Sequence, residues 1–223
     1  MERLMLALDL GTTSVKAGLY SAEGRELASA TEEYQLLTPS AIEAELPAET
    51  YWEASLKTLR FVIAKAGSNV IAGISISSQG ETLIPVDKDG QALRNAIVWV
   101  DNRAANQAAY LNERLTNVYK RTGIPEVTPT WPACKILWMK EKEPELFART
   151  HKFLMVQDYL IHRLTGRYVT NGSISCTTLY FDIVDSCWWQ DALNEMGIDE
   201  NLLPEILEPG EIVAPMCSEA VSQ

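Results

Sequence analysis

The first 34 residues place apolar side chains in short alternating blocks, which is the pattern of β-strands. Residues 4–8 form an apolar run, and apolar side chains at Val15, Ala17 and Leu19 alternate with polar or small ones. Turns that contain glycine separate the blocks, and a third block covers residues 26–34. The pattern predicts three consecutive antiparallel strands, an opening unlike that of a dinucleotide-binding fold.

The pattern changes to helical spacing over residues 47–66, where apolar side chains recur every three or four positions. Pro47 near the start and Gly67 just past the end are typical helix boundaries, so an amphipathic helix is expected. Residues 70–77 alternate apolar and small side chains and predict a half-buried strand. The next elements expected are a hairpin of residues 83–86 and 96–99 around a turn at 88–90, a helix over 157–166, an extended stretch at 173–183 and short helices near 188–196. This order predicts an α/β fold with a mixed sheet flanked by helices.

The net charge of the chain limits the classes of ligand that it is expected to bind. The chain has 19 Lys and Arg against 30 Asp and Glu, a formal net charge of -11, which argues against binding to nucleic acid or to an anionic membrane. A small molecule is the expected ligand, and a phosphate site would have to use backbone N–H groups, hydroxyls and a metal ion. Four cysteines without a CxxC pair are expected to be reduced. The N-terminus lacks a signal-peptide pattern and no apolar run spans a membrane, so the cytoplasm is predicted.

The strongest candidate for chemistry follows the first predicted strand. A carboxylate at the strand end, a glycine turn and three hydroxyls suit the terminal phosphates of a nucleotide and a Mg²⁺ ion held through water. A plain hairpin with a polar turn is the alternative. The residues of this candidate phosphate loop are Asp9, Gly11, Thr12, Thr13, Ser14 and Lys16, and Asp9 is the candidate metal ligand.

A second polar segment follows the strand predicted at residues 70–77. Glu81 can accept hydrogen bonds from sugar hydroxyls, Gln79 can donate and accept, and Gly80 leaves room for a ligand. The alternative is a solvated turn. Trp99, Asp101 and Arg103 form a third set, either a sugar-facing aspartate held by an arginine or an ordinary helix cap with an ion pair.

Together, in this order and spacing, these segments resemble the FGGY carbohydrate kinases, which include glycerol, xylulose, gluconate and fuculose kinases. The resemblance covers nearly the whole chain and continues through three further blocks, 135–138, 158–160 and 164–166. It implies the N-terminal, sugar-binding lobe of an actin-like ATPase (ribonuclease H-like) fold, with ATP and Mg²⁺ as cofactors and a sugar or polyol as substrate. ATP would be bound mostly by a second lobe. A homodimer is left open.

Two departures limit what the resemblance implies. Glycerol kinases have an arginine and xylulose kinases a Met-His pair near Gly80, so the sugar stays open, with a xylulose-like pentulose as the preferred candidate. Trp131 stands near the place where glycerol kinases offer a tyrosine, and could stack on a sugar or pack in the core. The family's general base is an aspartate beyond Gln223, so no catalytic residue is expected in this chain. Its ATP-binding lobe is likewise expected outside residues 1–223.

Two other classes of function compete with a kinase lobe. The chain could be a non-catalytic module that binds a sugar or a nucleotide, or an actin-like or chaperone-like ATPase lobe. The polar segments at residues 79–82 and 99–103 favour the kinase, because an actin or chaperone lobe needs no polyol contacts there.

Overall fold

The first strands form the expected antiparallel meander and a fourth strand joins it in parallel. The computed structural model describes residues 2–67 and 69–222. The sheet has the order β3-β2-β1-β5, with β1 antiparallel to β2 and parallel to β5. Its strands are β1 (Arg3–Leu10), β2 (Ser14–Ser21), β3 (Glu26–Glu33) and β5 (Val70–Ser78). Because β1 and β5 run in the same direction, the segments that follow them leave the sheet at one edge.

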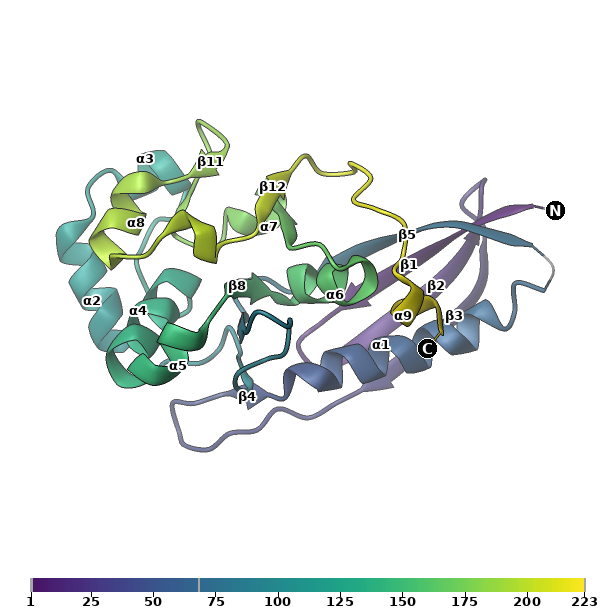
Figure 1. Cartoon of the computed structure of the whole chain (residues 1–223), viewed down its shortest axis with the longest axis horizontal. Coiled ribbons are helices and arrows are strands. Elements are labelled where there is room, and N and C mark those ends of the chain that lie inside the picture. Colours follow the sequence, from purple (N-terminus) through teal and green to yellow (C-terminus); the bar gives the residue numbers. More distant parts are fainter. Residues whose placement is uncertain (1, 68, 223) are drawn as a thin grey trace.

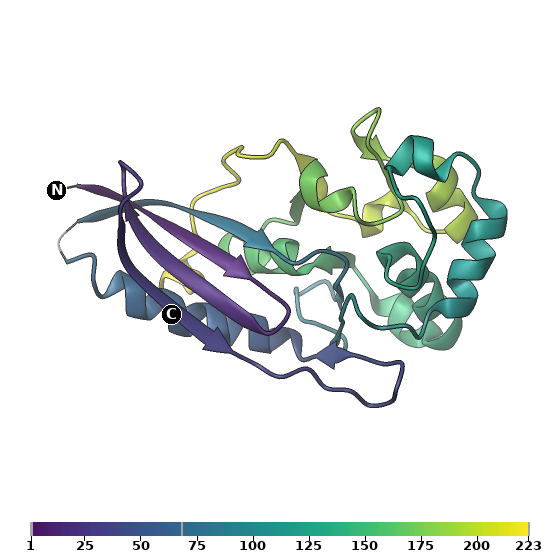
Figure 2. The same cartoon turned by 180° about the vertical axis from the view of Figure 1, so that it is seen from behind.

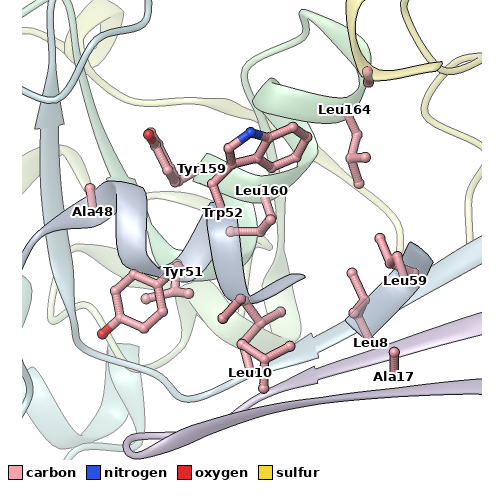
Figure 3. Close-up of a cluster of buried hydrophobic side chains, with 14 of the residues drawn as sticks. Leu8, Leu10, Ala17, Ala48, Tyr51, Trp52, Leu59, Tyr159, Leu160 and Leu164 are labelled. Carbon is pink, nitrogen blue, oxygen red and sulfur yellow. The ribbon is translucent and has the colours of Figure 1, made fainter. Parts of the chain in front are cut away.

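One face of this sheet is covered by α1 (Ala48–Ile63), and α6 (Val156–Thr165) packs beside it. Figure 3 shows the core that results, in which leucines of the sheet meet α1 and α6. The opposite face is turned toward the viewer in Figure 2, and no other described segment covers it. Met5 is accordingly 42% exposed on β1, whose alternate side chains are buried, and Leu27 is 37% exposed on β3.

The rest of the chain builds a second core at the other end of the molecule (Figure 1). A small sheet of order β4-β7-β6-β8 lies between the two cores. Its strands are β4 (Glu45–Leu46), β6 (Leu83–Val86), β7 (Ala96–Ile97) and β8 (Lys152–Met155). The helices of the second core are α2 (Ala105–Arg114), α3 (Val118–Thr122), α4 (Pro132–Lys142), α5 (Pro144–Arg149), α7 (Gly172–Ser175) and α8 (Gln190–Met196). The remaining elements are β9 (Val169–Asn171), β10 (Phe181–Asp182), β11 (Cys187–Trp188), the 3₁₀ helix η1 (Glu200–Leu202), β12 (Glu205–Leu207) and α9 (Ser218–Ser222).

The predicted α/β class with a mixed sheet is confirmed, and most element boundaries lie within a few residues of the expected ones. The extended stretch expected at 173–183 is wrong for most of its length, because the Asn171 side chain accepts the N–H groups of Ser173 and Ile174 and starts α7. The strand expected at 96–99 ends at Ile97. None of the helices in the described residues combines the length and apolar character needed to span a bilayer.

Candidate active site

The candidate phosphate loop is a tight turn between β1 and β2. The Gly11 N–H donates to the Ser14 carbonyl oxygen at 2.9 Å, and a Cβ at position 11 would lie 3.3 Å from that oxygen. Close approach of the backbone, rather than a left-handed conformation, therefore favours glycine at this position. No hydrogen bond among the described residues uses the backbone N–H groups of Thr12 or Thr13. Two adjacent donors at the end of a strand are thus available to an anion.

Asp9 lies on the uncovered face of the sheet, since Leu8 and Leu10 on either side of it are buried toward α1. Its direct neighbours across the sheet are Lys16 of β2 and Ser77 of β5. The Asp9 carboxylate is exposed and accepts no hydrogen bond from the described residues. Asp9 and Lys16 therefore stand side by side, with the carboxylate open to a ligand.

Gln79 joins the phosphate loop to the segment after β5. Its side-chain oxygen accepts from the hydroxyls of Thr12 (3.3 Å) and Thr82 (3.2 Å). Its side-chain nitrogen donates to the Gly11 carbonyl oxygen (3.2 Å) and to the Tyr51 hydroxyl (3.0 Å). Both donors and both acceptor positions of the amide are used inside the protein. Contact between Gln79 and a sugar stays a prediction; the geometry shows a brace between the two loops.

Aromatic side chains support the same loop. The Tyr34 hydroxyl donates to the Gly11 carbonyl oxygen at 2.5 Å, and the Trp99 indole N–H donates to the Thr12 hydroxyl at 2.9 Å. Tyr51 carries its hydroxyl away from the packed leucines (Figure 3) and toward Gln79. Burial raises the pKa values of Tyr34 and Tyr51 well above the ordinary range, so both hydroxyls keep their protons near neutral pH.

Glu81 stands at the centre of a three-residue turn. The Thr82 N–H donates to the Gly80 carbonyl oxygen at 2.7 Å, and Glu81 has a φ of 57°, which is rare for a residue with a side chain. Glu81 is half-buried. Burial raises the pKa of its carboxyl, while the charge of Lys135 and the hydroxyl of Thr177 act in the opposite direction. A carboxylate beside a cation and a hydroxyl is suited to accept hydrogen bonds from a polyol.

Gly80 is held against the turn that follows α7. A Cβ at position 80 would lie 3.0 Å from the Thr177 hydroxyl oxygen and 3.6 Å from its methyl carbon. Thr177 is fixed in this place because its hydroxyl donates to the Ile174 carbonyl oxygen at 2.8 Å. The space that a larger residue at position 80 would need is therefore filled by Thr177.

Asp101 and Arg103 lie behind the site in a buried network. Asp101 has no exposed surface, and its carboxylate accepts from the Ala44 N–H at 2.7 Å and from the Arg103 guanidinium at 2.8 to 3.0 Å. Arg103 also donates to Glu45 at 2.7 Å and stacks on the Trp138 ring. Direct contact with a sugar stays a prediction for these two residues, since every oxygen of Asp101 already has a protein partner.

Trp131 is the N-cap residue of α4, and its indole N–H donates to the Glu126 carbonyl oxygen at 2.9 Å. The ring is half-buried and packs against the second core. Contact between Trp131 and a sugar stays a prediction. The described residues also hold no group of three His, Cys, Asp or Glu side chains placed to ligate a metal.

The structure thus brings the loop of Asp9 and the segment of Glu81 to one edge of the sheet and joins them through Gln79. Sequence reasoning missed four residues that support them: Tyr34, Tyr51, Lys135 and Thr177. Lys135 had a usable signal, because it is a charged residue in an otherwise buried stretch of the α4 sequence.

A mixed sheet that carries the Asp9 loop and the Glu81 turn at one edge, flanked by helices, has the architecture of an α/β domain of the actin-like ATPase class. Residues 4–223 match the N-terminal domain of the FGGY family of carbohydrate kinases, and the chain belongs to this family. The resemblance noted from the motifs is confirmed.

Curated relatives include kinases of three different substrates. The chain is 32% identical to a xylulose kinase of Bacillus subtilis (strain 168) over 216 residues, covering 96% of this chain and 43% of that protein. It is 34% identical to a glycerol kinase of Thermococcus onnurineus (strain NA1), with 95% and 44% covered. Among solved structures, a gluconate kinase from Lactobacillus acidophilus matches with a TM-score of 0.93 and 30% identity, over 100% of this chain and 45% of that one. The chain therefore spans less than half the length of these three proteins.

Proposed function

We propose that the whole protein is an ATP-dependent carbohydrate kinase and that this chain supplies its sugar-binding lobe. One observation carries the proposal. The loop with free N–H groups follows β1, and the segment with the Glu81 carboxylate follows β5, the parallel neighbour of β1. The side-chain amide of Gln79 forms hydrogen bonds to both. Ligands of open α/β sheets bind at this kind of edge. A transferable phosphate and an acceptor hydroxyl would then meet between the two segments.

The roles divide by chemistry. The N–H groups of Thr12 and Thr13 and the hydroxyl of Thr13 would stabilise charge on the phosphate oxygens, with Ser14 and Lys16 beside them. Phosphoryl transfer depends mainly on positioning and charge stabilisation, which this hydrogen-bonded loop would provide. Tyr34 and Trp99 hold the loop in place through their hydrogen bonds to it. The general base that takes the proton from the sugar is expected outside this chain.

Asp9 fits a Mg²⁺ ion that accompanies ATP. Mg²⁺ in kinases is held by one or two carboxylates together with substrate phosphates and waters, so a single open carboxylate beside free N–H groups is a sufficient protein contribution. When bound, the ion would offset negative charge on the phosphates. Asp9 would hold it, and Thr12 would orient the phosphate.

We further propose a neutral pentulose of the xylulose type as the substrate, bound through Glu81 with Gly80 and Trp131 nearby. The support is chemical: Glu81 accepts hydroxyl donors, and the cations behind it, Lys135 and Arg103, are already paired with protein oxygens. A cytoplasmic location stays a prediction.

The test is calorimetric titration of this chain with D-xylulose, glycerol and gluconate, followed by Glu81→Ala. Charge-assisted hydrogen bonds contribute about 1.5–3 kcal/mol each, so losing one should weaken binding of the preferred ligand by roughly 10- to 150-fold. Glu53→Ala is the matched control, because Glu53 is exposed on α1 and makes no described side-chain hydrogen bond. Equal affinity of the parent and Glu81→Ala would contradict the proposal.

A further inference from the structure

Lys135 is a lysine with no exposed surface that lies directly behind the Glu81 turn. Its ammonium nitrogen donates to the Glu81 carbonyl oxygen at 2.9 Å. This is the one described hydrogen bond of a group that carries three donors. A buried ammonium is costly unless charge and hydrogen bonds compensate it, and replacing the lysine by an apolar residue would avoid that cost. The buried ammonium therefore contributes little to the stability of α4 by itself.

The turn that Lys135 contacts is a strained one. Glu81 adopts a left-handed φ of 57° between Gly80 and Thr82, a conformation that costs about 1–3 kcal/mol for a residue with a side chain. Such a conformation persists only where the surroundings fix it. Two contacts do so: Thr177 packs against Gly80, and Lys135 holds the carbonyl of the strained residue itself.

The charged side chains from Glu45 to Glu81 alternate in sign along a series of contacts that includes Lys135. Glu45 is hydrogen-bonded to Arg103, and Arg103 to Asp101. The carboxylates of Asp101 and Glu81 both act electrostatically on the Lys135 ammonium. Asp101 and Arg103 can thus influence the sugar segment through Lys135 without touching a sugar.

We propose that Lys135 is a positioning residue that fixes the left-handed Gly80–Thr82 turn and thereby aims the Glu81 carboxylate at a hydroxyl of the sugar. The inference rests on the proposed function for the ligand of Glu81. The conformational part, in which Lys135 fixes the turn, stands without it.

The first experiment compares sugar affinity in Lys135→Met with that in Lys140→Met, using the sugar that binds the parent most tightly. Lys140 is a matched control because it lies on the same helix and also donates to backbone carbonyls, those of Met196 and Gly197 at 2.9 and 2.7 Å. Lys135→Met should weaken binding about 10-fold, the effect of one charged hydrogen bond, and Lys140→Met by less than about twofold. Lys135→Arg, which keeps the charge, should restore part of the loss. Equal affinities of the parent and Lys135→Met would overturn the role in sugar recognition.

The second experiment needs no sugar. The Thr82 amide is bonded across the turn to Gly80, so its hydrogen-exchange protection factor reports whether the turn is fixed. Lys135→Met should lower that factor at least 10-fold more than it lowers that of the Asn102 amide, which bonds to Ile42 elsewhere. Equal changes at both amides would mean general destabilisation and would overturn the proposal.

A third measurement uses the parent alone and so does not depend on a variant that folds. Burial lowers the pKa of Lys135 to about 7, against the attraction of Asp101 and Glu81, with Cys134 and Arg103 also facing it. The Thr82 protection factor should fall about fivefold as the pH rises from about 6 to about 8, because a neutral amine makes a weaker hydrogen bond than an ammonium. A protection factor that does not change over this range would overturn the proposal. A parent that binds no sugar would instead contradict the proposed function and leave the exchange results to decide the role of Lys135.

Discussion

Replacing Gln79 by methionine tests whether the two loops of the site depend on one amide. Methionine has nearly the same length and shape but no donor or acceptor of comparable strength. The substitution removes the bonds to Thr12, Thr82, Gly11 and Tyr51 together. It leaves the backbone N–H of residue 79 on the Leu10 carbonyl oxygen, so the parallel pairing of β1 and β5 is kept.

The size of the effect follows from the number and quality of these bonds. A typical hydrogen bond contributes about 0.5–1.5 kcal/mol net, and the four lengths of 3.0 to 3.3 Å place them at the weak end. Gly11 retains the Tyr34 hydroxyl, and Thr12 retains the Trp99 indole. We therefore expect a loss of about 2 kcal/mol in the free energy of unfolding, which for a chain of this length corresponds to a Tm lower by about 4–8 °C.

Urea and thermal unfolding of the parent, Gln79→Met and Gln35→Met give the comparison. Gln35 is exposed and makes no described side-chain hydrogen bond, so Gln35→Met controls for adding a methionine. The control should unfold within about 1 °C of the parent, as surface substitutions usually do. A Gln79→Met protein as stable as the control would refute the idea that this amide braces the loops.

Two further substitutions test single carboxylates. In the whole protein, Asp9→Asn should lower kcat far more than it raises the KM for sugar, because the amide keeps the shape but loses the charge directed at phosphate and Mg²⁺; a normal kcat with a raised KM would make Asp9 a sugar ligand instead. Asp158→Asn should stabilise the chain increasingly as the pH rises. Burial raises the pKa of Asp158 from 3.8 to about 7. Between these pH values the carboxyl is ionised in the unfolded chain and protonated in the folded one, so the parent loses stability as the pH rises. The amide oxygen of the variant can still accept the Met155 N–H. Urea unfolding from pH 4.5 to 8 checks this, and a difference that stays constant with pH would contradict it.

The sheet and the first helix were predictable because their signals are local. Alternation gives the strands, Pro47 is the N-cap of α1, which ends at Ile63 a few residues before Gly67, and Gly166 ends another helix with a φ of 77°. The failure at residues 173–183 has a local cause too. Small polar side chains can form hydrogen bonds with nearby backbone groups, and the Asn171 side chain does so with the N–H groups of Ser173 and Ile174. A short helix therefore begins where the alternation suggested a strand.

The candidate site was predictable only as two separate motifs. The bond between Thr12 and Gln79 spans 67 residues, and the bond between Trp99 and Thr12 spans 87. Nothing in either motif specifies these partners, because the first bond follows from the parallel pairing of β1 with β5 and the second from the place that the chain takes after β7. Tyr34 and Tyr51 were missed for the same reason: each reads as an ordinary apolar position of its own strand end or helix.

The polar residues of the motifs fall into two groups, those whose polar atoms are hydrogen-bonded within the protein and those whose polar atoms are free to contact a ligand. Asp101 and Gln79 have the residue types of sugar ligands, yet their oxygens are already bonded within the protein, and a group with no free donor or acceptor has little to offer a ligand. Glu81, Thr12 and Thr13 keep free groups at the surface of the same edge. The sugar and phosphate contacts should therefore concentrate on these three residues, and the paired residues behind them should act by fixing where the free groups point.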